Sequence, residues 1–393
     1  MSTAVAVREF LDREAGAMIE LLEQFVAIET PSDVPESQQP MLDLLAHSFG
    51  EIGYRTTRIP ARRQYGGHLY ARPARSRTED TRHWQLLLGH CDTVWKLGTL
   101  ESMPVIRDGD VLKGPGVYDM KAGLVEIIFA LKALEALGFE PVVEPVVFIN
   151  SDEEVGSRES TRYIRALARR ADRALVMEPS LGLGGKLKTA RKGVGRFVVK
   201  VTGKAAHSGL DPTGGASAIL ELSHVIQKLF ALNDPGRGAS VNVGVIDGGV
   251  RANVVAPESS AIVDVRVASH EDAERIQEAI LGLEAETAGV RVEVEGNIGR
   301  PPLEHTAANR QLWRIAVDLA QELDFELEEA MAGGASDGNT TSLYTATLDG
   351  LGAVGDGAHA DHEHIFVSLL PQRCALLTTL LLEQPLQTGR ASQ

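Results

Sequence analysis

The stretch LLLGHCDTVW, residues 86–95, decides how the chain can fold. Three leucines and a glycine without a charged residue are typical of a strand buried on both faces, as in a parallel sheet covered by helices. The strand ends in His90, Cys91 and Asp92. Because side chains two positions apart in an extended segment point the same way, His90 and Asp92 can act together. A histidine and a carboxylate at this place indicate a functional site or a satisfied structural pair.

Length and composition limit the class of protein. The 393 residues are more than one compact core usually takes, so we expect two domains. A net charge of −15 would repel phosphates and argues against binding to nucleic acid. The two cysteines cannot form a disulfide framework, and no apolar run has the character of a signal peptide or the roughly 20 residues of a membrane span. We therefore expect a soluble, cytoplasmic protein without membrane contact.

The hydrophobic pattern predicts two kinds of domain. In residues 1–191 and 303–393, apolar strands alternate with helices, among them helices expected at 15–29 and 121–137. This alternation is typical of an α/β domain with a mixed, mostly parallel sheet. In residues 192–302, alternating strands and two amphipathic helices follow a βαββαβ-like order, which favours a small α+β domain with one open sheet face. The sequence therefore predicts an α+β domain inserted into an α/β domain.

Four further segments place carboxylates or a histidine where an apolar strand or a glycine-rich turn ends. They carry Asp119 (in GPGVYDMKAGL), Glu153 and Glu154 (in NSDEEVGS), Glu178 (in VMEPS) and His359 (in GDGAHADHEHIF). Ligands of open α/β sheets bind at the carboxyl ends of the strands, where these segments are expected. Taken alone, Asp119 could simply cap a helix. In the last segment, His362 and His364 compete with His359 for the ligand role.

The combination of these side chains predicts a metal centre. Its candidate ligands are His90, Asp119, Glu154, Glu178 and His359. Two nitrogens and three carboxylates suit zinc, and cobalt or manganese accept the same donors. Five ligands are too many for one tetrahedral site with an open position, but they fit two metals about 3.5 Å apart that share a carboxylate. Since adjacent residues point in different directions, one of Glu153 and Glu154 can bind metal while the other acts as a general base.

The order of these motifs carries a family resemblance. The pattern H-x-D … G-x-x-D-M-K-x-G … E-E-x-G-S … E-P … G-x-x-x-H-x-x-x-E covers nearly the whole chain. It resembles the di-zinc metallopeptidase family that includes glutamate carboxypeptidase, aminoacylase, acetylornithine deacetylase and succinyl-diaminopimelate desuccinylase. Glutamate carboxypeptidase is the member that it looks most like. The resemblance implies an enzyme whose α/β domain holds the two metals and whose inserted domain forms a homodimer.

The resemblance also implies a role for each residue of the metal centre. Two zinc ions would be bridged by Asp119 and held by His90 and Glu178 on one side and by Glu154 and His359 on the other. Glu153 would be the general acid/base, and Asp92 would orient the imidazole of His90. The peptide bond between Asp119 and Met120 would be cis, as is common in this family.

The resemblance also implies which residues contact the substrate. His207, in TGKAAHSGLDP, would reach the active site of the partner subunit and stabilise the oxyanion there. Asn253 and Arg300 would bind the free carboxylate of the leaving amino acid, for which the Arg fork is suited. Lys186 would read a glutamate side chain, and Lys188 is its rival. The glycine-rich segment GGASDGN (333–339) would line the same pocket.

The expected activity is hydrolysis of an amide bond next to a free carboxylate, with release of a C-terminal amino acid. The alternative is an N-acyl amino acid deacylase that uses the same metals and base. Arg300 argues against an amidase without a carboxylate requirement. A metal-binding dimer that has lost catalysis is the alternative from another class, and the presence of Glu153 argues against it. The sequence does not define the amino acid or acyl group that is recognised.

Overall fold

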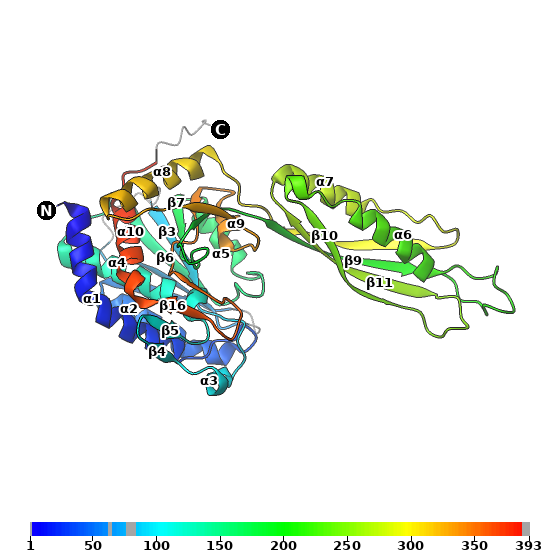
Figure 1. Cartoon of the computed structure of the whole chain (residues 1–393), viewed down its shortest axis with the longest axis horizontal. Coiled ribbons are helices and arrows are strands. Elements are labelled where there is room, and N and C mark those ends of the chain that lie inside the picture. Colours follow the sequence, from blue (N-terminus) through cyan, green and yellow to red (C-terminus); the bar gives the residue numbers. More distant parts are fainter. Residues whose placement is uncertain (1, 62–64, 76–83, 387–393) are drawn as a thin grey trace. The chain divides into compact units, whose positions relative to one another are not determined.

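The computed structural model describes residues 2–61, 65–75 and 84–386, which form two compact units (Figure 1). Unit 1 comprises Met1–Thr189, His305–Met331 and Ser336–Gln393, and unit 2 comprises Ala190–Glu304 and Ala332–Ala335. The junctions expected from the sequence, at 191/192 and 302/303, lie two residues from these. The sequence pattern gave no indication that the short segment 332–335 joins unit 2.

Unit 1 is built on a six-stranded, mostly parallel sheet. Its strand order is β1 (Tyr54–Ile59), β2 (His68–Pro73), β6 (Glu144–Asn150), β3 (Trp84–His90), β7 (Ala171–Val176) and β14 (Ala346–Leu348). The last four strands run parallel to one another, whereas β1 pairs with β2, and β2 with β6, in the antiparallel sense. This arrangement confirms the expected mixed sheet and brings the carboxyl ends of β3, β6 and β7 to one edge.

Helices cover both faces of this sheet. One face packs against α1 (Thr3–Val26), α2 (Gln39–Glu51), α4 (Ala122–Leu137), α8 (Ala307–Glu322) and α10 (Leu370–Leu382), and the other against α5 (Thr161–Ala168). Along β3 the buried side chains alternate, since Leu87 belongs to the first core and Leu86 and Leu88 to the second. The apolar run of this strand therefore serves two cores. No helix of the described residues is both long and apolar enough to cross a membrane.

The first helix is longer than the sequence reading suggested. We expected it to begin at residue 15, but α1 begins at Thr3, after Ser2, whose hydroxyl accepts a hydrogen bond from the N–H of Val5. Ala4 and Leu11 are buried in the same core as the rest of the helix. The charged residues between them lie on the solvent side, so the apolar stripe continues through a segment that reads as polar.

Short elements complete unit 1. They are α3 (Thr99–Ser102), α9 (Asp337–Thr341), β8 (Leu187–Arg191) paired with β13 (Glu329–Ala332), and a small sheet of β4 (Ile106–Asp108), β5 (Val111–Lys113), β16 (His364–Phe366) and β15 (Gly355–Asp356). Two of them, β8 and β13, continue into the first residues of the unit 2 segments. Residues Val117–Lys121 form a turn that leads directly into α4. The expected cis peptide bond between Asp119 and Met120 is present in this turn.

Unit 2 is an α+β sandwich of one sheet and two helices. Its elements follow one another as β9 (Gly193–Thr202), α6 (Ala218–Phe230), β10 (Ser240–Gly248), β11 (Glu258–Val267), α7 (His270–Leu281) and β12 (Arg291–Arg300). This is the βαββαβ order that the sequence predicts. The strands form an antiparallel sheet in the order β10–β11–β9–β12, and Figure 1 shows both helices on one of its faces. The alternating burial along β9 leaves the other face open.

Candidate metal centre

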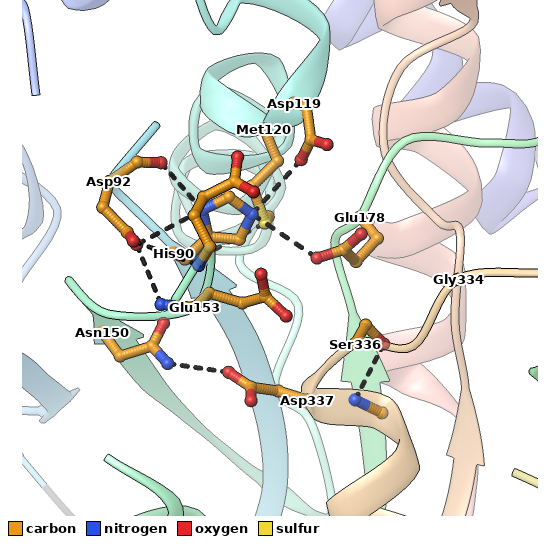
Figure 2. A network of polar contacts seen from close by, with 12 residues as sticks. His90, Asp92, Asp119, Met120, Asn150, Glu153, Glu178, Gly334, Ser336 and Asp337 are labelled. Carbon is orange, nitrogen blue, oxygen red and sulfur yellow. Dashed lines mark hydrogen bonds and ion pairs between the residues drawn. The ribbon is translucent and has the colours of Figure 1, made fainter. Parts of the chain in front are cut away.

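Three parallel strands deliver the candidate ligands to one edge of the unit 1 sheet. His90 is the last residue of β3, Glu153 and Glu154 follow β6 within four residues, and Glu178 lies two residues beyond β7. Figure 2 shows the side chains of His90, Asp119, Glu153 and Glu178 pointing toward one another. The buried strands therefore fix the positions from which these side chains converge, as the sequence reading expected.

Asp119 lies between two histidines and directs one carboxylate oxygen toward each. Its Oδ1 lies 3.2 Å from Nε2 of His90, and its Oδ2 lies 3.4 Å from Nε2 of His359. The same Nε2 of His90 lies 3.5 Å from Oε1 of Glu178, and that of His359 lies 3.2 Å from Oε2 of Glu154. The five candidate ligands thus form two groups that share Asp119.

The spacing of these atoms fits bound metal ions. Atoms that bind zinc tetrahedrally at about 2.0–2.1 Å lie about 3.3 Å from one another, which is close to the distances within both groups. His90 Nε2, Asp119 Oδ1 and Glu154 Oε1 are buried and have no hydrogen-bond partner in the described part of the chain. Buried polar atoms are normally paired, so a cation at this place would satisfy all three. The donor set therefore fits a dinuclear metal centre.

The electrostatics of the ligands lead to the same conclusion. Asp119 and then Glu154 raise the pKa of His359 to about 10. Burial lowers the pKa of His90, but the nearby carboxylates of Asp119, Asp92 and Glu178 outweigh this effect and raise that pKa well above its usual value. Burial raises the pKa of Glu154 to about 7. The clustered carboxylates thus create an anionic environment that divalent cations neutralise.

Asp92 contacts both the ligand His90 and the loop that carries the glutamates. Nδ1 of His90 lies 3.0 Å from the backbone carbonyl oxygen of Asp92 and 3.5 Å from its carboxylate. Nδ1 therefore carries the proton, and Nε2 keeps its lone pair for a metal. The carboxylate of Asp92 accepts the N–H groups of Glu153 and Glu154 at 3.1 and 3.2 Å. Asp92 thus contacts His90, as expected, and it also holds the backbone of Glu153.

Glu153 lies beside one of the two ligand groups. Ligand atoms of Glu153, His90 and Glu178 lie within 4.8 Å of one another. Glu153 is only 8% exposed, and its neighbour Glu154 lies 3.2 Å from His359 in the other group around Asp119. The two adjacent glutamates therefore point to different parts of the site, as the sequence reading required.

His359 is the histidine of its segment that contacts the other ligands. It is half-exposed, at 50% for the side chain, and its backbone has a positive φ of 62°. The rival His364 lies in β16, where its Nδ1 donates to the carbonyl oxygen of His362 at 2.8 Å and its ring packs edge-on against Phe366. His359, in contrast, places its Nε2 3.4 Å from Asp119 Oδ2 and 3.2 Å from Glu154 Oε2.

The substrate residues expected in unit 2 lie at two ends of its sheet. His207 forms a bridge with Val254, and the N–H of Ser208 donates to the carbonyl oxygen of Asn253 at 3.1 Å, so the segments of His207 and Asn253 are neighbours beyond the end of β9. Arg300 pairs with Val194 at the start of β9. Within one copy of unit 2, Arg300 is therefore separated from the other two residues by the length of the strand.

The two candidate lysines differ in their surroundings. Lys186 is an exposed side chain whose Nζ forms an ion pair with Glu328 at 2.6 Å. Lys188, in β8, is only 8% exposed and is close enough to lower the pKa of Asp119 electrostatically. Of the two lysines, Lys188 is therefore the better placed to act on Asp119.

Asp337 supports the glutamate loop from a distant part of the sequence. Asp337 is only 3% exposed, and its carboxylate accepts a hydrogen bond from Nδ2 of Asn150 at 2.7 Å (Figure 2). It also accepts a hydrogen bond from Oγ of Ser157 at 2.5 Å. These two residues are the ends of the loop that carries Glu153 and Glu154. The sequence reading noted the segment GGASDGN but did not single out Asp337, because its two contacts span 187 and 180 residues.

Known proteins resemble this chain over most of its length. Residues 86–383 match Peptidase family M20/M25/M40. Carboxypeptidase G2 of Pseudomonas sp. (strain RS-16) is 28% identical over 377 residues, with 94% of this chain and 90% of that protein covered. Succinyl-diaminopimelate desuccinylase of Delftia acidovorans is 27% identical over 373 residues, with 89% and 93% covered.

Solved structures share the fold. An aminopeptidase PepT from Bacillus cereus superposes with a TM-score of 0.75 at 20% identity and covers 93% of this chain and 98% of its own. A dinuclear metal-binding peptidase of the M20 family from Bacillus subtilis gives a TM-score of 0.68 at 13% identity, with 94% and 98% covered. The family match includes every ligand of the centre described above and well over half of the chain. The chain therefore belongs to Peptidase family M20/M25/M40 and is a metal-dependent hydrolase.

Proposed function

We propose that the enzyme uses two zinc ions to hydrolyse an amide bond next to a free carboxylate, releasing a C-terminal amino acid. One observation carries the proposal. One carboxylate oxygen of Asp119 lies next to His90 and the other next to His359, and Glu153 lies close to His90. The similarity to carboxypeptidase G2 over nearly the full length of both chains supports the carboxypeptidase activity.

The residues of the centre divide the work of hydrolysis. One ion would be held by His90, Asp119 and Glu178, and the other by Asp119, Glu154 and His359. When bound, such ions polarise a carbonyl group and lower the pKa of water. A carboxylate oxygen of Glu153 accepts the proton of the attacking water and passes it to the leaving nitrogen. Asp92 holds the backbone of Glu153, so little reorganisation is needed during the reaction.

His207 supplies a hydrogen-bond donor to the substrate carbonyl. Its Nδ1 accepts the N–H groups of Gly209 and Leu210, each at 3.2 Å. Nδ1 is therefore unprotonated, and the proton of the neutral ring lies on Nε2. Nε2–H is then a donor suited to the negative charge that develops on the carbonyl oxygen.

The proposed reaction needs two copies of the chain. The ten residues of β9 separate His207 and Asn253 from Arg300 by about 30 Å, which a dipeptide-sized substrate cannot span. We propose that His207 and Asn253 of a partner copy complete the site in a homodimer. Exposed apolar side chains of unit 2 offer a surface for this contact: Ile219, Leu220 and Phe230 on α6, and Val245 and Ile246 on the edge strand β10.

Arg300 and Lys188 would recognise the released amino acid. The fork of the Arg300 side chain suits a bidentate contact with the free carboxylate. Lys188 is the better candidate for reading an acidic side chain, because its charge acts on Asp119 of the metal centre, whereas the Lys186 side chain is 41% exposed. The sequence favoured Lys186 because of its distance along the chain from Glu178. The structure favours Lys188 because of its surroundings.

N-acyl amino acid deacylation is the second candidate function. It needs the same metals and the same base, and the similarity to a succinyl-diaminopimelate desuccinylase favours it. The two candidates differ in the part of the substrate that governs the rate. A carboxypeptidase responds to the C-terminal residue, whereas a deacylase responds to the acyl group.

A panel of N-acyl amino acids and dipeptides tests the proposal. The panel varies the C-terminal residue and the acyl group separately, includes amides without a free carboxylate, and is run with and without a chelator. Chelator-sensitive release that prefers Glu or Asp supports the carboxypeptidase and Lys188. A rate set by the acyl group supports the deacylase. Equal cleavage of the amides without a carboxylate, or no release by the zinc-loaded protein, would contradict the proposal.

A further inference from the structure

Glu363 is a buried carboxylate with four N–H donors. Its side chain is 0% exposed. Oε2 accepts Nε1–H of Trp95 at 2.8 Å and the N–H of Gly116 at 2.9 Å. Oε1 accepts the N–H groups of Tyr118 at 2.9 Å and of Asp119 at 3.0 Å. A carboxylate is costly to bury unless such donors satisfy both of its oxygens, and here each oxygen accepts two.

The four donors and Glu363 belong to three ligand-bearing segments. Trp95 follows His90 by five residues, in the loop after β3. The three backbone donors, Gly116, Tyr118 and Asp119, lie immediately before and within the Val117–Lys121 turn. Glu363 itself follows His359 by four residues, and its own N–H donates to the carbonyl oxygen of Ala360 at 2.9 Å. One side chain thus links the histidine of one metal group, the shared carboxylate and the histidine of the other.

We propose that Glu363 is a positioning residue, which holds the Asp119 turn and the His359 loop at the separation that the second metal ion requires. The inference rests on the proposed dinuclear centre and deepens it. Both carboxylate oxygens of Glu363 are engaged by N–H groups of the ligand-bearing segments, so it acts through the ligands. The partners of a ligand commonly change metal affinity 10- to 100-fold when they are altered.

The two ions depend on Glu363 to different degrees. His90 is fixed by β3, whose backbone pairs with β6 and β7 on both sides. His359 lies in a loop and is half-exposed, so the contacts of Glu363 contribute more to its position. Loss of Glu363 should therefore weaken the ion of Asp119, Glu154 and His359 more than the ion of His90, Asp119 and Glu178.

The substitution Glu363→Gln tests this inference without changing the shape of the side chain. A glutamine keeps one acceptor oxygen, but its NH2 group must face two N–H donors and cannot accept from them. Trp95→Phe is a milder variant that removes a single donor. Glu221→Gln is the matched control, because Glu221 is also buried and accepts two backbone N–H groups, from Glu286 and Thr287, in unit 2.

The experiment is a zinc titration of the full-length, chelator-treated chain against a competing chromophoric chelator, with folding followed by circular dichroism. In Glu363→Gln we expect the weaker of the two zinc dissociation constants to rise about 10- to 100-fold, the tighter one to change less than about threefold, and excess zinc to restore kcat. Trp95→Phe should show a smaller rise of the weaker constant, and Glu221→Gln should show none.

Two outcomes would overturn the role of Glu363. One is a folded Glu363→Gln protein with both zinc constants unchanged. The other is a folded Trp95→Phe protein whose two zinc dissociation constants are unchanged. This second outcome decides the question if Glu363→Gln does not fold. The proposed function fails by a different result, namely a zinc-loaded wild-type chain that cleaves none of the substrate panel. The two failures are therefore distinguishable.

Discussion

The carboxylate of Asp92 accepts a hydrogen bond from the backbone N–H of Glu153, with an N···O distance of 3.1 Å. Its other oxygen accepts the hydroxyl of Ser32 at 2.7 Å and the N–H of Glu154 at 3.2 Å. Because the carbonyl group of Asp92 also holds His90, one residue aligns a metal ligand and the proposed base. The chemistry of this site therefore depends on a side chain that need not touch the substrate.

Replacing Asp92 with Asn should slow the reaction and leave substrate binding nearly unchanged. One acceptor oxygen becomes an NH2 group that faces N–H donors, so the glutamate loop shifts. We expect kcat to fall about 10- to 100-fold with little change in KM, measured by steady-state kinetics on the best substrate of the panel. Asp43→Asn, at an exposed carboxylate, serves as the control. A kcat within twofold of the wild type would refute this role.

Removing the carboxylate of Glu153 should separate metal binding from turnover. We expect Glu153→Ala to keep both metal ions and to lose about 10²- to 10⁴-fold in kcat, because the proton transfer has no acceptor. Bound metal is measured by elemental analysis of the same preparation. Normal activity would disprove the assignment, and the loss of one metal ion would make Glu153 a ligand instead of the base.

Mixing two inactive variants should restore activity if His207 acts in the partner copy. In a mixed dimer of Glu153→Ala and His207→Ala chains, one of the two sites has both residues intact. Random exchange of subunits should recover about a quarter of the wild-type activity, since half of the dimers are mixed and half of their sites are complete. Recovery is measured after subunit exchange of the two purified variants. An inactive mixture with proven exchange would place His207 outside the partner's reaction.

Metal binding should release protons and strengthen as the pH rises. Without metal, Asp119 and Glu154 hold the pKa of His359 at about 10, so its ring is protonated at pH 7.5. Zinc binds only the neutral ring, and the proton must therefore leave on binding. Titration calorimetry in two buffers of different ionisation enthalpy should give different heats. Equal heats in both buffers, or an affinity that falls between pH 6.5 and 8, would contradict this expectation.

The buried Glu126 should make the metal-free protein less stable as the pH rises. Both of its oxygens lack a hydrogen-bond partner among the described residues, and burial raises its pKa well above the ordinary 4.5. Above pH 4.5 the unfolded chain loses the proton that the folded chain keeps, so the free energy of unfolding falls with pH. Glu126→Gln should remove up to about 1.4 kcal/mol of this decrease per pH unit.

Urea unfolding of both metal-free proteins at pH 5, 6.5 and 8 measures this effect. The advantage of the glutamine variant over the wild type should grow from the lowest pH to the highest. A difference in unfolding free energy that stays constant across the three pH values would show that Glu126 keeps an ordinary pKa in the folded chain.

The sheet and the convergence of the candidate ligands could be predicted because both follow from local patterns. The apolar run before His90 defines a strand buried on both faces, and parallel strands bring their carboxyl ends to one edge. The positions of Asp119, Glu154 and Glu178 after such strands or turns then followed from order along the chain. The start of α1 was missed because Ala4 and Leu11 are weak apolar signals among charged residues.

The supporting contacts could not be predicted, because they join segments far apart in the sequence. Asp337 meets Asn150 across 187 residues, and Glu363 meets the Asp119 turn across 244. Nothing in the sequence near either carboxylate indicates its partners. The choice between Lys186 and Lys188 likewise depends on local structure, because Lys186 exchanges backbone hydrogen bonds with Leu181 in a turn, whereas Lys188 lies in β8.

The central claim is that Asp119 joins two metal sites in one catalytic centre. The most direct test is to titrate the chelator-treated protein with zinc while bound zinc per chain and hydrolysis of the best substrate are followed together. We predict two zinc ions per chain and full activity only after the second has bound. Full activity with a single zinc ion per chain, and no further uptake, would contradict the shared role of Asp119.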